Sequence, residues 1–240
     1  MSVLALGDRL SGDDRDFFRR VWSTDPEVYR ARIRAAGFAG LGDVLDAGCG
    51  FGQWTMPLAE ANRSVEAIDA DEARVDVARR ALSGLSNVRV SRGSVGRLPY
   101  PDESFDGIFC YSVLYYTDHR RALAEFARVL RPDGRLYVCG NGLGWYLHNL
   151  IDGHNGSAFF DPRAMAAQAL ADTLAGRTGR QIVIPSEVLV RDCAAARFEV
   201  EAVGPEGTLA VAGEVPGTPF FKGTYHGQEG VYELIARKAR

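Results

Sequence analysis

Between residues 43 and 140, short apolar runs alternate with longer amphipathic stretches. The apolar runs predict strands, and the stretches with apolar residues at helical spacing predict helices. The predicted strands are 43–47, 65–69, 87–91, 105–111 and 135–140, and the helices between them are 53–62, 72–82 and 118–130. Strands that alternate with helices are typical of a parallel sheet covered on both faces. The pattern resumes near the end of the chain with a helix at 186–196 and strands at 197–203 and 230–237.

The segment before the first strand shows only helical patterning. We expect residues 1–12 to be a loose tail and residues 13–20 and 25–36 to be short helices. Because this segment precedes the sheet, we expect residues 1–42 to form a helical cap on it. Two roles stay open for the cap: it packs on the sheet, or it is a lid that places Tyr29 and other aromatic residues over a ligand.

Two segments interrupt the alternation of strands and helices. Residues 141–180 predict two helices, at 141–152 and 162–175, with no strand between them. Residues 204–228 form a long loop rich in glycine, proline and aromatic residues. Long irregular loops inside a compact domain are usually functional. We therefore expect one domain over 43–240, in which these two insertions form a lid over the site.

Composition argues against several classes of function. The formal net charge of −3 provides no general attraction to nucleic acid or to an anionic membrane. No apolar stretch is long enough to span a bilayer, and the first residues lack the pattern of a signal peptide. The four cysteines lie far apart and form no CxxC pair, so we expect no metal site. Free thiols favour a cytoplasmic location.

A glycine turn after the first predicted strand is the strongest candidate for a ligand site. A short apolar run leads into Asp46, and Gly48, Gly50 and Gly52 follow before helical sequence begins. Glycines here allow unusual backbone angles and a close approach of a ligand, and the next helix begins with free N–H groups. A dinucleotide-binding turn requires the spacing G-x-G-x-x-G, and Gln53 breaks that spacing.

Asp69 ends the second predicted strand. The carboxyl ends of neighbouring parallel strands lie at the same edge of a sheet. The carboxylate of Asp69 can therefore accept hydrogen bonds from the diol of a ribose bound at the glycine turn. Together, the turn and this acid indicate a ligand that contains a nucleoside.

In this region the chain resembles the class I S-adenosylmethionine-dependent methyltransferases. The resemblance covers residues 43–140, with a fainter similarity at 186–203. Five features carry it, in the order and spacing of the family: the glycine turn from Val44 to Gly52, Asp69, the segment from Gly93 to Tyr100, the strand from Phe105 to Ser112, and the run from Arg121 to Leu136.

The resemblance implies an α/β fold with a Rossmann-like, doubly wound sheet of seven strands, the last of them antiparallel. It also implies S-adenosylmethionine as the cofactor. The cofactor-binding residues predicted from the family pattern and from the cap are Tyr29, Asp46, Gly48, Cys49, Gly50, Asp69, Ala70, Ser94, Val95, Cys110 and Tyr111.

The resemblance assigns each part of the cofactor to a part of the chain. The glycine turn and Asp46 would hold the methionine end, Asp69 would hold the ribose, and Ser94 with Val95 would meet the adenine. Cys110 and Tyr111 would lie beneath the transferring methyl group.

The chain departs from the family pattern at two places. Ser94 replaces an aspartate, so a contact to the adenine amino group is weaker or moves to the backbone. Tyr115 and Tyr116 stand where the family often has a histidine after the fourth strand, which leaves the identity of a base open.

The predicted reaction is transfer of a methyl group to an oxygen or nitrogen of a small molecule, such as a natural product or a sugar. It is an in-line displacement, in which alignment of donor and acceptor supplies much of the rate. A hydroxyl acceptor usually needs a base, and histidine is the first candidate. We favour His148 and His154, because the loop after the fifth strand opens at the carboxyl edge of the sheet. His119 is expected to be a solvated surface residue.

Two further interpretations stay open. The chain binds S-adenosylmethionine but transfers no methyl group or runs a non-methyl reaction, or it is a nicotinamide oxidoreductase, which the spacing around Gln53 disfavours. The expected partner is a small-molecule acceptor. A nucleic-acid partner is not expected, since no surface that combines stacking aromatic residues with basic residues is evident. The oligomeric state is not predicted.

Overall fold

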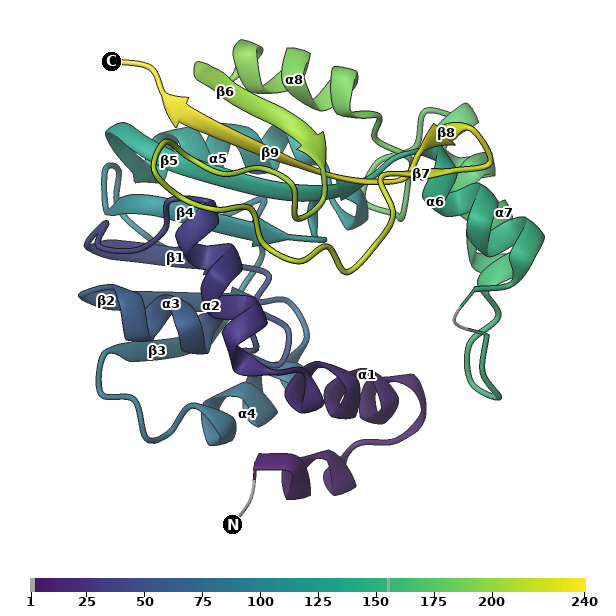
Figure 1. Ribbon diagram of the computed structural model, residues 1–240, viewed down its shortest axis with the longest axis horizontal. Coiled ribbons are helices and arrows are strands. Elements are labelled where there is room, and N and C mark those ends of the chain that lie inside the picture. Colours follow the sequence, from purple (N-terminus) through teal and green to yellow (C-terminus); the bar gives the residue numbers. More distant parts are fainter. Residues whose placement is uncertain (1–2, 155) are drawn as a thin grey trace.

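A computed structural model describes residues 3–154 and 156–240. Its centre is a seven-stranded sheet in the order β3-β2-β1-β4-β5-β9-β6 (Figure 1). The strands are β1 Asp43–Ala47, β2 Ser64–Asp69, β3 Val88–Arg92, β4 Phe105–Tyr111, β5 Leu130–Asn141, β6 Phe198–Pro205 and β9 Val231–Lys238. The first five strands pair in parallel, and β9 is antiparallel to both β5 and β6. The predicted seven-stranded sheet with its antiparallel last strand is confirmed.

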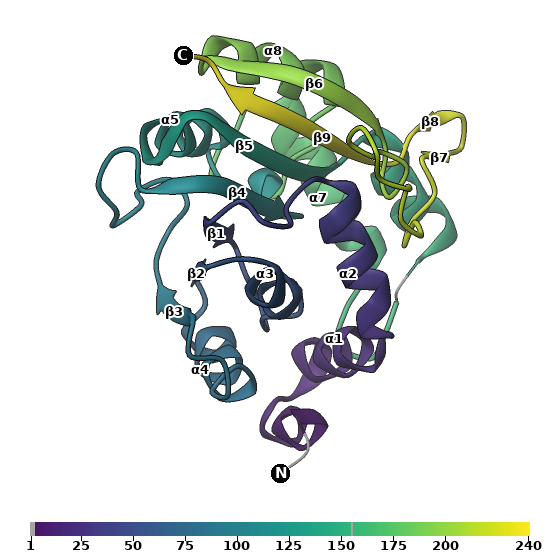
Figure 2. The ribbon, with the colours of Figure 1, turned by 60° about the vertical axis from the view of Figure 1, so that its left-hand side comes forward.

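Helices cover both faces of the sheet because the central strands are apolar on both sides. The helices are α1 Gly12–Ser23, α2 Pro26–Ala35, α3 Thr55–Ala61, α4 Glu72–Ala81, α5 His119–Val129, α6 Leu143–Leu147, α7 Pro162–Leu174 and α8 Ser186–Ala195. Apolar residues of α2 and α3 pack on one face, and those of α5 and α8 pack on the other (Figure 2). Side chains at the N-terminus of a helix set some of these boundaries. Asp71, for example, accepts hydrogen bonds from the backbone N–H groups of Ala73 and Arg74.

The expectation of a loose tail at 1–12 is wrong for residues 3–9, and residues 1 and 2 lie outside the described residues. Val3–Arg9 forms a 3₁₀ helix, η1, in which Leu6 is buried. Leu6 packs in a small apolar cluster with Phe18 of α1, Phe51 of the glycine turn and Val77 of α4. The apolar residues from Val3 to Leu6 are consecutive, so no helical spacing is visible in the sequence. The segment is ordered by the apolar surface that α1 and α4 present to it.

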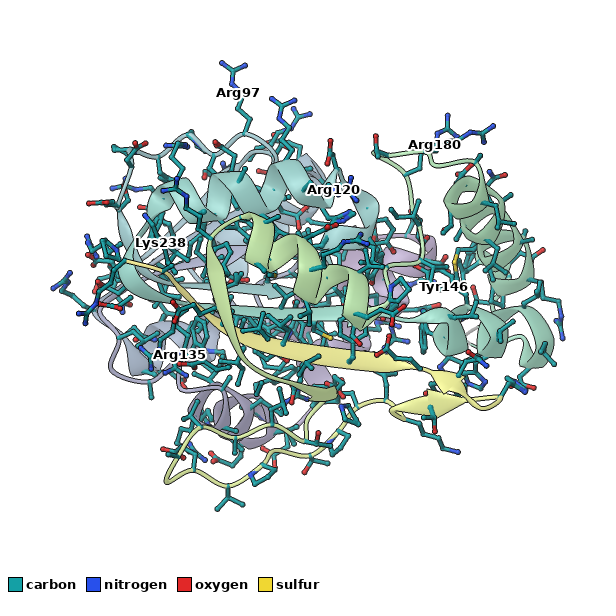
Figure 3. All side chains as sticks on the ribbon, turned by 90° about the horizontal axis from the view of Figure 1, so that it is seen from above. Arg97, Arg120, Arg135, Tyr146, Arg180 and Lys238 are labelled. Carbon is teal, nitrogen blue, oxygen red and sulfur yellow. The ribbon has the colours of Figure 1, made fainter. Side chains whose placement is uncertain are left out.

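The first insertion continues β5 outward beyond the end of the sheet (Figure 1). After α6, the chain makes a π-helical turn, His148–Asp152 (η3), which ends at Gly153 in the left-handed conformation with φ +68°. Tyr146 of α6 is buried and donates its hydroxyl hydrogen to the carbonyl of Ile182, which joins this insertion to the segment before α8 (Figure 3).

The second insertion, 204–228, contains structure that the sequence does not predict. Near its end are two short strands, β7 (Thr224–Tyr225) and β8 (Gln228–Glu229). They pair with each other in an antiparallel hairpin. This hairpin lies beside α6 at the carboxyl edge of the sheet (Figure 1). The two insertions therefore meet at one end of the molecule although they are separated in sequence.

Candidate functional site

The glycine turn between β1 and α3 has a backbone that only glycine accommodates without strain. Gly48, Gly50 and Gly52 have φ angles of +87°, +53° and +85°. A Cβ atom on Gly48 would lie 2.1 Å from Cγ2 of Val113, and one on Gly52 would lie 2.7 Å from Cδ1 of Leu82. At Gly50 the nearest atom is 3.8 Å away, on the side chain of Gln53. Neighbouring groups therefore crowd the two outer glycines, whereas a Cβ atom on the central one would meet only the side chain of Gln53, at ordinary contact distance.

Asp69 joins the glycine turn to the turn that follows β2. One oxygen of its carboxylate accepts a hydrogen bond from the backbone N–H of Gly50 at 2.9 Å, and the other accepts one from the N–H of Asp71 at 2.9 Å. The N–H groups of Gly48 and Cys49 donate to the carbonyl of Ile68, at 2.7 and 3.0 Å. The predicted position of Asp69 at the carboxyl edge, beside the turn, is confirmed.

Asp46 lies beneath the turn and is nearly inaccessible to solvent, with 1% of its surface exposed. It accepts a hydrogen bond of 2.6 Å from the hydroxyl of Thr55, the first residue of α3. Burial raises the pKa of Asp46 to about 7, the bond from Thr55 opposes that shift, and the charge of Asp69 adds to it. A cation bound nearby would favour the ionised form of Asp46.

A small cavity separates the glycine turn from the cap. Its lining includes Trp22 from α1, Tyr29 from α2 and Gln53 from the turn. Two buried polar atoms at this place, Nε1 of Trp22 and Oε1 of Gln53, have no hydrogen-bond partner among the described residues. Buried polar atoms are nearly always paired. One donor and one acceptor without partners, beside the glycine turn, fit a site for a polar ligand.

Aromatic rings line the boundary between the turn, the cap and the second insertion. Trp54 lies 4.8 Å from Tyr29, 4.8 Å from Tyr111 and 6.2 Å from Phe220, measured between ring centroids. Tyr29 is 5% exposed and donates its hydroxyl hydrogen to the carbonyl of Val21. These rings come from four segments and form one apolar wall.

A buried ion-pair network holds the cap and the second insertion to the sheet. Arg32 of α2 lies 2.5 Å from Oε1 of Glu206 and 3.1 Å from Oε2 of Glu233 on β9. Tyr111 donates its hydroxyl hydrogen to the same oxygen of Glu206, at 2.8 Å, and Oε2 of Glu206 accepts from the N–H of Phe220. Sequence analysis did not single out Arg32 or Glu206. The signal available was a charged residue, Glu233, inside an otherwise apolar strand.

The other predicted cofactor-binding residues lie in different environments. Val95 is buried, whereas Ser94 and Ala70 are exposed, and the hydroxyl of Ser94 accepts from the N–H of Gly96. Cys49 is buried within the turn. Cys110 is fully buried in the core cluster that contains residues of α5 and α8, on the face opposite to that of Tyr111. A contact between Cys110 and a ligand on the Tyr111 side would therefore involve its backbone. The cofactor contacts of all these residues stay predictions.

His148 and His154 are neighbours in the first insertion, and Asp152 and His226 lie beside them. The rings of His148 and His154 lie 4.4 Å apart, and His148 stacks on Tyr225 of β7 at 4.2 Å. Oδ2 of Asp152 lies 2.6 Å from Nδ1 of His148 and 2.7 Å from Nε2 of His226. Burial lowers the pKa of His154, and the charge of His148 lowers it further. We call His148, Asp152, His154 and His226 the histidine cluster.

The expectation that His119 is a solvated surface residue is wrong. It is 8% exposed, and its Nε2 lies 2.8 Å from Oδ2 of Asp192 on α8. Arg120 approaches the same carboxylate from the exposed side, between α5 and α8 (Figure 3). His119 faces α8 because it is the first residue of α5, whose apolar face packs against that helix. It therefore belongs to the contact between α5 and α8.

The strand order, the glycine turn and the acid at the end of β2 define a doubly wound α/β fold, a class in which ligands bind at the carboxyl edge of the sheet. Residues 45–138 match a sequence family described as a methyltransferase domain. The uncharacterized methyltransferase YcgJ of Bacillus subtilis (strain 168) is 39% identical over 98 residues, covering 40% of this chain and 39% of that protein. A demethylmenaquinone methyltransferase of Tropheryma whipplei (strain Twist) is 35% identical over 116 residues, covering 48% of each protein.

Solved structures share the whole fold. The structure of the 4+2 cyclase SpnF superposes with a TM-score of 0.62 at 21% identity, covering 89% of this chain and 81% of that one. Residues 45–138 are therefore similar to a methyltransferase domain, and the solved structure shares the fold. This chain matches less than half the length of the two curated relatives described above.

Among residues 3–154 and 156–240, no helix has the length and apolar character needed to cross a membrane.

Proposed function

We propose that this protein transfers a methyl group from S-adenosylmethionine to an oxygen or nitrogen of a small molecule. The observation that carries the proposal is the contact between the Asp69 carboxylate and the N–H of Gly50. It places an acid that suits a ribose diol beside a glycine turn in which Gly50 is uncrowded. The family match supports methyl transfer as the chemistry.

The residues of the turn fit this cofactor. Both oxygens of Asp69 lie at the end of β2 and keep lone pairs for ribose hydroxyl groups beyond the two N–H donors. The unpartnered Oε1 of Gln53 and Nε1 of Trp22 suit the amino and carboxylate groups of a methionine end. The bound cofactor supplies an electrophilic methyl group on a positively charged sulfur. Asp46 would balance part of that positive charge from below the turn.

The remaining predicted contacts complete the cofactor site. Val95, with Ser94 and Ala70 beside it, would border the adenine, and Tyr111 would lie under the methyl group. Tyr29 would cover the methionine end from the cap, in the wall that it forms with Trp54. This wall excludes water, which favours a displacement in which charge is neutralised.

We place the acceptor between the cap and the two insertions. The aromatic wall continues from Phe220 to its neighbour Phe221, and Phe221 lies 5.0 Å from Trp145 of α6. His148 and His154 lie at the outer end of this wall and are the candidates for a proton acceptor. The bond between Nδ1 of His148 and Asp152 leaves Nε2 of His148 free for an acceptor hydroxyl. The fully or largely buried free thiols at all four cysteines favour a cytoplasmic location.

The first experiment measures binding of S-adenosylhomocysteine by calorimetry. We expect Asp69→Ala to weaken binding at least about tenfold, since hydrogen bonds to a charged group are lost. Asp69→Asn keeps an acceptor for the N–H of Gly50 and shows whether the charge or the turn geometry matters. Asp76→Asn, on the exposed surface of α4, is the matched control and should bind like wild type. Unchanged binding in Asp69→Ala would contradict the site.

A second candidate function is binding of S-adenosylmethionine without methyl transfer, or with a different reaction. A solved structure with the same fold is named as a cyclase, which shows that this fold also occurs in a protein named for a different reaction. Incubation with methyl-labelled donor and a small-molecule extract separates the two candidates. A labelled small molecule supports methyl transfer. Binding of the donor without any labelled product supports the alternative.

A further inference from the structure

Three side chains from two distant segments converge on one point of the lid. His148 and Asp152 lie one helical turn apart in η3, and His226 lies in the turn between β7 and β8. Oδ2 of Asp152 contacts one nitrogen of each imidazole. It lies 2.6 Å from Nδ1 of His148 and 2.7 Å from Nε2 of His226. The three ligand atoms all lie within 4.8 Å of one another. Two nitrogens and one oxygen therefore face a common centre.

The backbone around this centre is arranged in an uncommon way on both sides. A π-helical turn carries His148 and Asp152, and such turns are rare and frequently mark functional sites. His226 and Gly227 have φ angles of +49° and +72°, so they form a two-residue hairpin turn with both central residues left-handed. Asparagine, aspartate and glycine are favoured there, and a histidine carries a conformational cost. The imidazole of His226 is held beside Asp152 in spite of that cost.

Neighbouring aromatic side chains fix the orientation of the rings. His148 stacks on Tyr225 with an angle of 13° between the ring planes. Trp145 borders both of these rings, since its ring centroid lies 6.4 Å from that of His148 and 6.2 Å from that of Tyr225. His148 is 19% exposed, whereas Asp152 and His226 are 43% and 35% exposed. The centre is therefore rigid on its inner side and accessible from solvent.

We propose that His148, Asp152 and His226 bind a divalent transition-metal ion, for which Zn²⁺ is the probe. Two imidazoles and one carboxylate are a common ligand set for zinc and for non-haem iron. Metal–ligand bonds of about 2.0–2.2 Å keep ligand atoms roughly 3 Å apart, so each contact to Asp152 needs to open by well under 1 Å. The ion would take the place of the hydrogen on each of these two nitrogens, and each neutral imidazole would then carry that hydrogen on its other ring nitrogen.

This proposal departs from the expectation of no metal, which rested on the spacing of the cysteines. It also divides the roles of the histidines. A metal-bound His148 carries its remaining proton on Nε2 and accepts no other, so His154 would be left as the candidate proton acceptor. Three protein ligands leave at least one coordination position for water or for an oxygen or nitrogen of a bound molecule.

The test uses the full chain without an affinity tag and needs neither cofactor nor acceptor, so it can fail while methyl transfer is present. Calorimetric titration with Zn²⁺ should give one site per chain. His226→Asn suits the left-handed turn and removes the imidazole, and Asp152→Asn keeps a hydrogen-bond acceptor and removes the charge. We expect each variant to weaken Zn²⁺ binding at least about 100-fold. Mutation of residues that only support metal ligands already lowers metal affinity about 10- to 100-fold, and these variants remove ligands themselves.

Glu214→Gln is the matched control, because Glu214 is an exposed carboxylate in the second insertion, which also contains His226. It should bind Zn²⁺ like wild type. Zn²⁺ should also raise the melting temperature of wild type and Glu214→Gln, and not that of the two ligand variants, because a ligand of the native state stabilises it. Absence of saturable binding at one ion per chain would overturn the proposal and leave a hydrogen-bonded cluster. Wild-type affinity in either ligand variant would overturn it as well.

Discussion

The glycine turn and the histidine cluster both lie toward the carboxyl edge of the sheet, but they are built in different ways. The turn is formed by consecutive residues whose backbone is fixed by glycines and by Asp69. The cluster is formed by side chains from two distant parts of the sequence, of which Asp152 and His226 are 74 residues apart, and they meet through a π-helical turn and a hairpin. A site made of backbone is specified locally, whereas a site made of side chains depends on how distant segments pack.

The largest expected effect concerns the ion pairs that hold the cap and the second insertion to the sheet. Arg32→Met leaves Glu206 and Glu233 buried without their counter-ion, and breaking a buried pair in this way costs about 3–5 kcal/mol. Urea unfolding measures the loss. Arg34→Met is the control, since Arg34 pairs with Glu27 at the surface and its loss should cost less than about 1 kcal/mol. Equal effects of the two variants would show that the buried network does not hold these segments.

The next effect tests whether the backbone of the turn defines the cofactor site. Gly48→Ala places a methyl group against Val113 in a left-handed conformation, and we expect a loss of stability of about 2–4 kcal/mol, since overpacking and backbone strain add together. S-adenosylhomocysteine binding should be lost as well. Gly40→Ala has a similar φ angle, +73°, with no atom within 4 Å of the new methyl group. It should cost only the strain, about 1–2 kcal/mol, and leave binding intact. A mild effect of Gly48→Ala would contradict the tight packing described for the turn.

The third effect is a dependence on pH that arises from Asp46. The native pKa is raised from 3.8 to about 7, so between these values the native protein holds a proton that the unfolded chain has released. The contribution of Asp46 to stability is therefore present at low pH and is lost as the pH rises through about 7. Asp46→Asn does not titrate, so its unfolding free energy relative to wild type should rise by roughly 1–4 kcal/mol between pH 4 and pH 8.

Urea unfolding at several pH values measures this difference. Thr55→Ser keeps the hydroxyl donor to Asp46 and is the control, whose difference from wild type should stay constant with pH. A constant difference for Asp46→Asn would show that Asp46 is ionised throughout this range.

The smallest expected effect lies where the first insertion meets the cap. The hydroxyl of Ser157 contacts Oδ1 of Asp13 on α1 at 2.9 Å, and the contact is exposed. Ser157→Ala should cost no more than about 1 kcal/mol in global stability. It should still speed proteolytic cleavage near residues 156–161. Asp13→Ala breaks the same contact but keeps the hydrogen bonds from Phe159 and Phe160 to Ser157, so similar cleavage in both variants would assign the effect to the contact between insertion and cap.

The same division between local and distant contacts explains which features could be predicted from the sequence. The order of strands and helices and the position of Asp69 were predictable, because they depend on hydrophobic period and on neighbouring residues in the chain. His119 was placed wrongly because its partner, Asp192, lies 73 residues away. Arg32 and Glu206 are separated by 174 residues, and no local pattern marks such a pair.

Local pattern also did not predict the hairpin in the second insertion. Its strands have only two residues each, which is too short for an alternation of polar and apolar residues to be visible. The contact between His226 and Asp152 depends on that hairpin. The sequence could therefore place His148 and His154 in one insertion, but it could not show that His226 joins them.

The buried network around Arg32 has a consequence for how molecules reach the interior. The cap and the second insertion are fixed to the sheet by buried charges that are costly to separate. The first insertion, where Ser157 meets Asp13, is held to the cap by exposed polar contacts that open at little cost. Under the proposed function, entry and exit should therefore occur where α1 contacts the loop before α7, and the size and polarity of residues at this contact would affect which acceptors are admitted.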